Sequence, residues 1–176
     1  NTEDQLVAVG YYSSTASIVV GTDVPTTEST NRIGLTEFSY DELARQWKTT
    51  TRKINQSTGA ITANGEIVTE QWRDEVGRVV KTRGGEYSKS RYDRLGRMTH
   101  RFVLASDNDT TYANALAIDG DIVMEEHQTV YESGSSDDVI MTASIMRLWN
   151  DRDTGSGETT GALDTNADSD DLKYTA

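Results

Sequence analysis

The sequence predicts an all-β fold, in which antiparallel β-hairpins join into one curved, twisted sheet. The pattern Asp-x-(Leu/Val)-(Gly/Ala)-Arg occurs three times, at residues 41–45, 74–78 and 93–97. Each copy leads into a run with strand character, and other segments alternate between polar and apolar residues with a period of two. The single Pro and the abundant Thr, Val and Tyr also favour strands.

Each copy of the pattern is interpreted as a hairpin turn. Asp is favoured at the start of a type I turn because its carboxylate accepts backbone N–H groups two residues further on. Gly three residues later supplies the positive φ that closes a three-residue loop. We expect the aliphatic residue between them to fold back on the sheet, and the Arg to begin the outgoing strand.

The N-terminal part predicts a hairpin followed by the first repeat. Residues 5–12 and 16–20 have strand character, and residues 21–32 form a polar connection. Residues 36–47 place Phe38, Leu43 and Trp47 near helical spacing, so a short helix competes with the hairpin there. We favour the hairpin because the aligned copies have Gly where this one has Ala44.

The middle of the chain predicts turns at residues 55–59 and at Asn64-Gly65, the latter a strong two-residue hairpin signal. Strands are expected at residues 66–72, 86–92 and 96–104.

Beyond residue 105 the pattern weakens. Residues 106–120 form a polar insertion, and Tyr131-Glu132 with the turn 133–138 resembles a fourth, decayed copy of the repeat. Further strands are expected at residues 121–132 and 139–149, and residues 172–176 are interpreted as the start of another, truncated repeat. We expect one repeat segment over residues 1–176, with 1–35 as hairpin and linker, 36–149 as hairpin repeats, and 150–171 as an acidic loop or disordered tract.

Composition sets further bounds on the protein. The 176 residues carry a net charge of −12 and no Cys, which excludes disulfides and thiolate metal sites. Residues 32–101 carry 14 Lys and Arg against 9 Asp and Glu, whereas residues 102–176 carry 3 against 16. The chain begins without Met and without a basic, apolar leader, so we expect an excised segment or a processed product. No apolar run is long enough to insert into a membrane.

The run Tyr92-Asp93-Arg94-Leu95-Gly96-Arg97 resembles the RHS or YD-repeat family, whose repeats read Tyr-Asp-x-x-Gly-Arg. The copy beginning at Tyr40 has Ala44 for Gly, and the copy at residues 74–78 lacks the Tyr-Asp pair. The resemblance covers residues 36–103. Its repeat positions are Tyr40, Asp41, Arg45, Asp74, Gly77, Arg78, Tyr92, Asp93, Gly96 and Arg97.

The resemblance implies a non-catalytic structural segment of a large secreted or cell-surface protein. In the larger members of the family, the hairpins wind into a hollow shell around a cargo polypeptide, so this chain would be an open arc of such a shell. The partners implied are flanking repeats and an enclosed C-terminal cargo. The self-cleavage motif that some members carry, an Asp-Pro-x-Gly tract, is absent here because Pro25 is the only proline.

Other candidate chemistry is weak. Residues 164–171 have Asp-x-Asn-x-Asp spacing, but Ser169 and Thr175 replace the Gly and Glu that a calcium loop of the EF-hand type requires. His100 and His127 have no second His at ligand spacing, and no nucleophile motif or phosphate loop occurs. We therefore expect no enzyme activity, cofactor or metal site.

A band of basic residues interleaved with aromatic ones supports an alternative function. Such a band could bind a carbohydrate or polyanion outside the cell, although nothing indicates nucleic acid. The opposing interpretation is that these cations pair with acids across strands and protect sheet edges. The basic residues are Lys48, Arg52, Lys53, Arg73, Arg78, Lys81, Arg83, Lys89, Arg91, Arg94, Arg97 and Arg101, with Trp47, Trp72, Tyr87 and Tyr92 among them.

Overall fold

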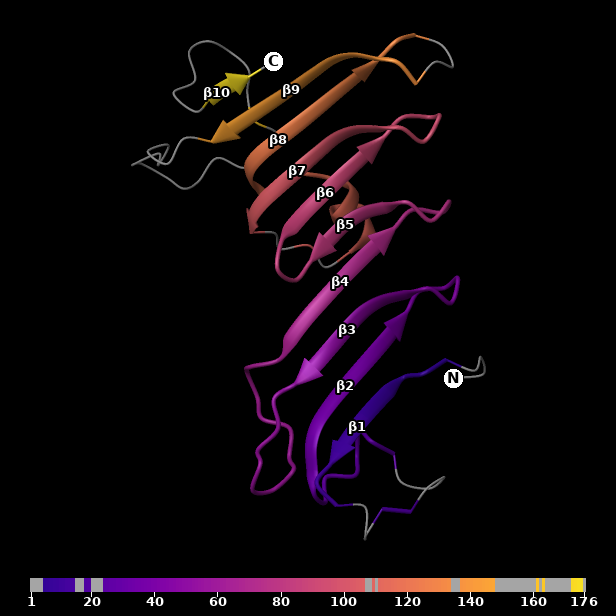
Figure 1. Cartoon of the computed structure of the whole chain (residues 1–176), viewed down its shortest axis with the longest axis vertical. Coiled ribbons are helices and arrows are strands. Elements are labelled where there is room, and N and C mark those ends of the chain that lie inside the picture. The colour runs from indigo at the N-terminus through magenta and orange to yellow at the C-terminus, as the bar shows by residue number, and fades with distance from the viewer. Residues whose placement is uncertain are drawn as a thin grey trace. The chain divides into compact units, whose positions relative to one another are not determined.

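The structure is a computed structural model that describes residues 5–14, 18–19, 24–106, 109, 111–133, 137–147, 161, 163 and 172–175. The chain divides into two compact units, Asn1–Gln71 and Trp72–Ala176. The boundary falls inside a strand rather than in a linker. Each unit is described separately below (Figure 1).

The first unit holds antiparallel strands that are hydrogen-bonded in chain order: β1 (Ala8–Tyr12), β2 (Arg32–Tyr40), β3 (Gln46–Arg52) and β4 (Ile67–Arg73), whose last two residues lie in the second unit. Phe38 lies opposite Thr49, and Thr49 lies opposite Thr69. Leu35 of β2 is buried, as expected for a strand that places one face against the interior, and Ile54, which follows β3, is buried as well.

The second unit continues the same plan: β5 (Val79–Arg83), β6 (Tyr87–Tyr92), β7 (Met98–Ser106), the helix α1 (Tyr112–Leu116), β8 (Ile122–Tyr131), β9 (Val139–Arg147) and β10 (Leu172–Thr175). From β5 onward, each strand pairs antiparallel with the next in the chain. The β6–β7 and β8–β9 turns lie at the same end of their strands (Figure 1).

The core of the second unit lies on one face of β7, β8 and β9. Its members are buried and apolar: Phe102, Leu104, Ile118, Val123, Ile145 and Leu163, with Tyr87 packed against them. They alternate with more exposed residues along each strand, which is the period-two pattern of a sheet with one covered face. α1 packs against β5 and β6 rather than against these strands.

The predicted fold class, all-β and built from antiparallel hairpins, is confirmed. At residues 36–47 the hairpin forms and the competing helix does not, because the chain closes a β-turn after β2. Between β3 and β4, the predicted turn at residues 55–59 is confirmed, and Ile54 bridges Ile61 across it. Asn64 and Gly65 have positive φ, but no paired strands flank them as the predicted two-residue hairpin requires.

β1 pairs with β2. The second strand of the predicted N-terminal hairpin, residues 16–20, lies largely outside the described residues. Ile18 and Val19 have no strand assignment, and residues 16, 17 and 20 lie outside the described residues. The sequence did not predict α1. The helix has only five residues, and its one recognisable start signal is the N-cap Thr111, whose side chain accepts a hydrogen bond from the Asn114 backbone N–H. Most of the predicted acidic loop, residues 150–171, lies outside the described residues.

Candidate functional site

The three pattern copies form turns with the same hydrogen bonds; residues 41–45, 74–78 and 93–97 are called turns 1, 2 and 3. In each, the Asp backbone N–H donates to the Arg carbonyl, at 2.9, 2.9 and 3.0 Å. The backbone N–H of the fourth residue donates to the Asp carbonyl, at 3.0, 3.0 and 3.1 Å. That fourth residue has positive φ: Ala44 at 62°, Gly77 at 94° and Gly96 at 87°. This is a type I turn closed by a left-handed residue.

The Asp side chain organises each turn. One carboxylate oxygen accepts the backbone N–H groups of the third and fifth residues, and the other accepts the Arg Nε, at 2.7 Å in turn 1, 2.6 Å in turn 2 and 2.7 Å in turn 3. Desolvation alone would raise the pKa of Asp74. The hydrogen bonds and charge of Arg78 outweigh it, so the pKa is lowered. The pKa values of Asp41 and Asp93 are lowered by the same balance, with Arg45 and Arg97 as partners.

Successive hairpins of the second unit contact each other through Arg and Tyr. The Arg78 guanidinium of turn 2 lies 4.7 Å from the centre of the Tyr92 ring, which ends the strand before turn 3. The Tyr92 hydroxyl donates to the carbonyl of Val79, the residue after Arg78, at 2.8 Å. Arg78 Nη1 also donates to the Asp93 carbonyl at 3.3 Å.

The same contact recurs one hairpin later. The Arg97 guanidinium lies 4.4 Å from the centre of the Tyr131 ring, and the Tyr131 hydroxyl donates to the carbonyl of Met98 at 3.0 Å. Tyr131 ends β8 and lies opposite Val139, as Tyr92 lies opposite Met98. We call this repeated pair of contacts the Arg–Tyr clasp. In the first unit, the Tyr40 hydroxyl likewise donates to a backbone carbonyl of the preceding segment, that of Leu6, at 2.8 Å.

The aliphatic residue of each turn does not fold back on the sheet, contrary to the prediction. Leu43, Val76 and Leu95 are 61%, 76% and 56% exposed. The Asp carboxylate holds the turn backbone through local hydrogen bonds, so the third residue projects from the tip of the hairpin.

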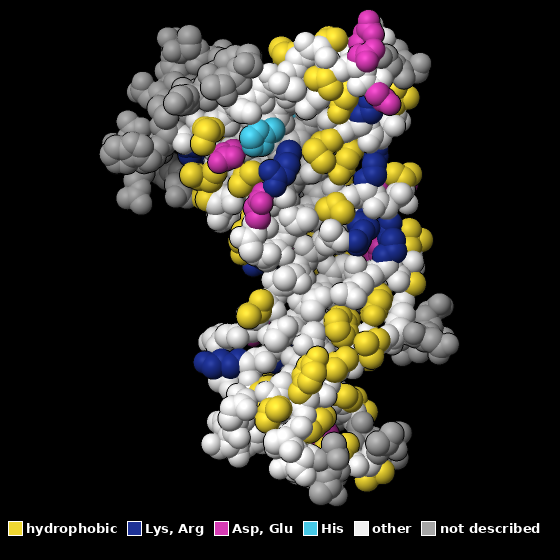
Figure 2. All heavy atoms as spheres, viewed as in Figure 1, with side chains coloured by type: hydrophobic (Ala, Val, Ile, Leu, Met, Phe, Trp, Pro, Cys, Tyr) yellow, Lys and Arg dark blue, Asp and Glu magenta, His cyan; other side chains and the backbone are white. Residues whose placement is uncertain are grey.

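The basic band is largely neutralised by acids. At least seven of its twelve members form ion pairs with Asp or Glu: Lys48, Arg52, Arg78, Lys81, Lys89, Arg97 and Arg101. Arg83 and Arg91 lie over the rings of Tyr87 and Phe102. Figure 2 shows cationic side chains interspersed with hydrophobic and acidic ones on the visible face. Lys48, Arg52 and Arg101 pair across strands, whereas Arg78 and Arg97 pair within their own turns. This arrangement favours local charge pairing over one continuous cationic surface.

Two members of the band are buried, which the sequence interpretation did not foresee. Lys81 and Lys89 face each other across β5 and β6 and are 1% and 2% exposed. Lys89 Nζ lies 2.5 Å from Asp121 Oδ2 and 2.6 Å from Asp109 Oδ2, and Lys81 Nζ lies 2.9 Å from the same Asp109 oxygen. We call these four residues the Lys–Asp cluster. In the sequence, the signals for this cluster were a lysine inside each of two neighbouring strands, Lys81 and Lys89, and the Asp-rich insertion after β7.

The Lys–Asp cluster also attaches α1 to the sheet. Lys89 Nζ donates to the carbonyls of Asn114 and Ala117, at the C-terminal end of the helix. Carbonyls there have no partner within the helix and carry partial negative charge, so a cation stabilises them. Trp72 stacks on Tyr112 of α1 at 6.4 Å, and Lys81 lies 5.8 Å from the Trp72 ring.

Both histidines lie on strands, at sites without metal-binding character. The His100 ring stacks on Phe102, and burial lowers the pKa of His100 against the opposing charge of Glu126. His127 Nδ1 lies 3.0 Å from the Ser144 hydroxyl. No group of three or more His, Cys, Asp or Glu residues forms a metal site among the described residues. The calcium-loop candidate at residues 164–171 lies outside them.

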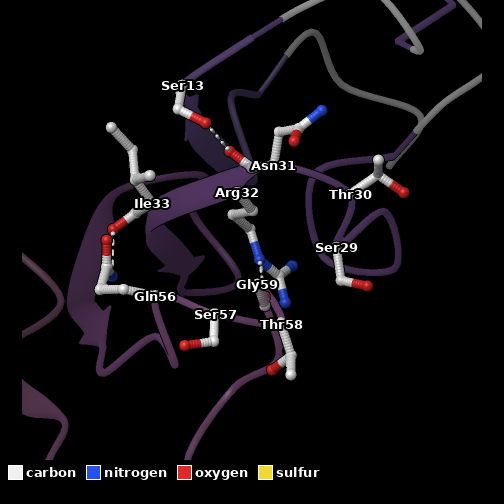
Figure 3. Close-up of a pocket in the computed structure, with 10 residues that line it drawn as sticks. All are labelled: Ser13, Ser29, Thr30, Asn31, Arg32, Ile33, Gln56, Ser57, Thr58 and Gly59. Carbon is white, nitrogen blue, oxygen red and sulfur yellow. Dashed lines mark hydrogen bonds between the residues drawn. The ribbon is translucent and has the colours of Figure 1, made fainter.

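A polar hollow of about 360 Å³ lies in the first unit, beside the connection before β2 (Figure 3). Its central side chain is the buried Arg32, whose guanidinium donates to the carbonyls of Gly59, at 2.9 Å, and Pro25, at 2.6 Å. The Ser13 hydroxyl and the Gln56 side-chain amide likewise donate to backbone carbonyls. These donors hold loops together, so the hollow has no evident catalytic arrangement.

Comparison with protein-family models finds no match, and comparison with curated proteins finds no similar sequence. Within the described residues, no helix is long and apolar enough to cross a membrane.

Proposed function

We propose that this chain is a non-catalytic wall segment of a large secreted or cell-surface YD-repeat protein, in which β-hairpins line a shell or scaffold around a cargo polypeptide. The observation that carries the proposal is the Arg–Tyr clasp. In each clasp an Arg guanidinium lies against a Tyr ring, and the Tyr hydroxyl donates to the carbonyl of the residue after that Arg. These two contacts join turn 2 to β6 and turn 3 to β8. A contact that each hairpin makes with the next is the connection that a repeat protein uses to extend.

Two further features support a structural role. Each Asp carboxylate of turns 1 to 3 makes local hydrogen bonds, so these residues stabilise turns rather than meeting a substrate. The strands pair with their neighbours in the chain, so the next hairpin on either side would add to an existing edge by backbone hydrogen bonds.

The proposal is tested on the complete polypeptide that contains this chain. We expect more Tyr-Asp-x-x-Gly-Arg hairpins on either side, a closed shell in electron micrographs, and protection of the C-terminal cargo from protease until the shell is denatured. A complete polypeptide with no further repeats, or a cargo digested as fast as an isolated peptide, would overturn it.

Binding of an extracellular carbohydrate or polyanion is the less supported alternative. At least seven cations of the basic band already have carboxylate partners, and several rings of the band are covered by cations. A polyanion would have to displace these intramolecular pairs.

A further inference from the structure

The Lys–Asp cluster buries four ionisable groups in mutual contact, which is more than a single ion pair requires. Lys89 Nζ lies within hydrogen-bond distance of two carboxylates, and all three groups are nearly excluded from water: the side chains of Lys89, Asp109 and Asp121 are 3%, 4% and 1% exposed. Burying several charges costs free energy that pairing only partly returns. A reaction that removes one buried pair of charges would therefore be favoured here.

The contacts of Lys89 suit an attacking amine. A neutral amine has two N–H donors and one lone pair, and the carbonyls of Asn114 and Ala117, at 2.9 and 2.5 Å, accept two donors. The third direction faces the carboxyl oxygens, with Asp121 Oδ2 at 2.5 Å. Lys89 donates in this direction while it is an ammonium; once it has lost a proton to Asp121, its lone pair would face the carboxyl group with which an amide could form.

The second carboxylate is placed to carry protons. Asp109 Oδ2 lies 2.6 Å from Lys89 Nζ and 2.9 Å from Lys81 Nζ. The Lys81 ammonium pairs with Asp109 before and after the reaction. Asp109 can receive a proton from Lys89 and return it, and the net charge of the cluster stays the same because the proton moves within it. A positioned carboxylate of this kind is a general acid–base group.

We propose that Lys89 and Asp121 condense into an intramolecular isopeptide bond, with Asp109 as the proton carrier. A proton moves from the Lys89 ammonium to the Asp121 carboxylate, which gives an amine and a carboxylic acid. Nζ then bonds to Asp121 Cγ. Asp109 takes the next proton from Nζ and delivers it to the departing hydroxyl, which leaves as water. One C–N bond forms, one C–O bond breaks, and no oxidant or reductant takes part.

The product has fewer buried charges than the starting cluster. The cluster begins with two ammonium and two carboxylate groups and ends with the Lys81–Asp109 pair alone. The amide retains one N–H, enough for one of the two helix carbonyls. The bond would fix the segment after α1 covalently to β6, whether or not the hairpins line a shell.

The test is the intact mass of the full chain, purified and measured under denaturing conditions. We expect a mass lower than that of the sequence by one water. Trypsin should leave the bond after Lys89 uncut and release a branched peptide joining residues 84–91 to residues 102–147. An intact mass equal to that of the sequence, with complete cleavage after Lys89, would overturn the proposal. So would a branch at Lys81.

Variants distinguish the roles of the groups. Lys89→Arg keeps the cation but removes the amine, and should restore the full sequence mass. Asp109→Asn should leave most of the protein unlinked at purification, because loss of a general acid–base group slows reactions about 100-fold or more. Lys53→Arg is the matched control, since Lys53 is an exposed lysine outside the Lys–Asp cluster, and this variant should still lose one water. If a variant does not fold, the wild-type mass and peptide map decide alone.

Discussion

Replacing Gly96 by Val should destabilise the second unit through the backbone of turn 3. Gly96 has φ of +87°, where an L residue with a branched Cβ is strained. The added Cβ would lie 3.4 Å from Arg78 Nη1, which is ordinary contact, so the cost comes from the backbone rather than from a collision. Residues with a Cβ lose about 1–2 kcal/mol in the left-handed region, and a β-branched residue loses at least that. In a chain of this size, each kcal/mol lowers Tm by about 2–4 °C.

Urea and thermal unfolding, followed by circular dichroism and by Trp fluorescence, measure this change. Leu95→Val is the matched control: it places a β-branched residue in the same turn at a position that is 56% exposed and lacks positive φ, so it should change stability by less than about 0.5 kcal/mol. Ala44→Gly is the reverse test in turn 1. It relieves the strain of Ala44 at φ 62° and should stabilise by roughly 0.5 kcal/mol, because unfolded-chain entropy offsets part of the gain. Wild-type stability in Gly96→Val, or destabilisation in Ala44→Gly, would refute the turn geometry.

Further perturbations test the other features. Tyr92→Phe keeps the ring beside Arg78 but removes the hydrogen bond to the Val79 carbonyl, and should cost about 1 kcal/mol in urea unfolding; an unchanged midpoint would contradict that bond. The pKa of Asp74 is lower in the folded state, so its stabilisation is present above the ordinary Asp value of 3.8 and is lost as pH falls through the lowered folded value. As pH falls below about 4, Asp74→Asn should therefore lose less stability than wild type, and an equal loss would argue against the turn contacts. The pKa of His100 is also lowered, so stability should fall as pH drops below the ordinary His value of 6.5, and His100→Gln should flatten that fall; parallel profiles would exclude His100 as the cause. On heparin the chain should elute at low salt, because its cations are paired, and salt-sensitive retention at high salt would favour the polyanion function.

The turns were predictable because their cause is local. Asp74, Gly77 and Arg78 lie within five residues, and every hydrogen bond that shapes the turn joins groups inside that window. The turn with Ala44 forms through the same local bonds, and Ala44 has positive φ although the other copies have Gly there. The fourth hairpin followed from Tyr131-Glu132, whose Glu132 N–H donates to the Asp138 carbonyl.

The Arg–Tyr clasp was not predictable from one copy of the pattern. Arg78 and Tyr92 belong to different hairpins, and their contact depends on the register between strands, which no local signal fixes. With hindsight, the recurrence of both residues in successive copies was the available sign. In both clasps the Arg stands just before one strand, and the Tyr ends the next strand along the chain.

The buried lysines show why a charged side chain is not by itself a reliable sign of an exposed position. Lys81 and Lys89 alternate with small and apolar residues, so a polar outward face was the natural expectation. The insertion after β7 covers this face and buries both lysines. Asp109, Asp121 and the carbonyls of α1 provide acceptors that make burial of two ammonium groups tolerable. These acceptors come from segments 20 or more residues away, beyond the reach of a periodicity argument.

A double-mutant cycle between Arg97 and Tyr131 measures whether successive hairpins hold each other through the Arg–Tyr clasp. The free energy of unfolding would be measured for wild type, Arg97→Met, Tyr131→Leu and the double variant. We expect a coupling of about 0.5–1 kcal/mol, from the guanidinium 4.4 Å from the ring centre. The same cycle with Arg94→Met, a second Arg of turn 3, should show none. A coupling of zero for Arg97 and Tyr131, or one equal to that of Arg94, would contradict the clasp.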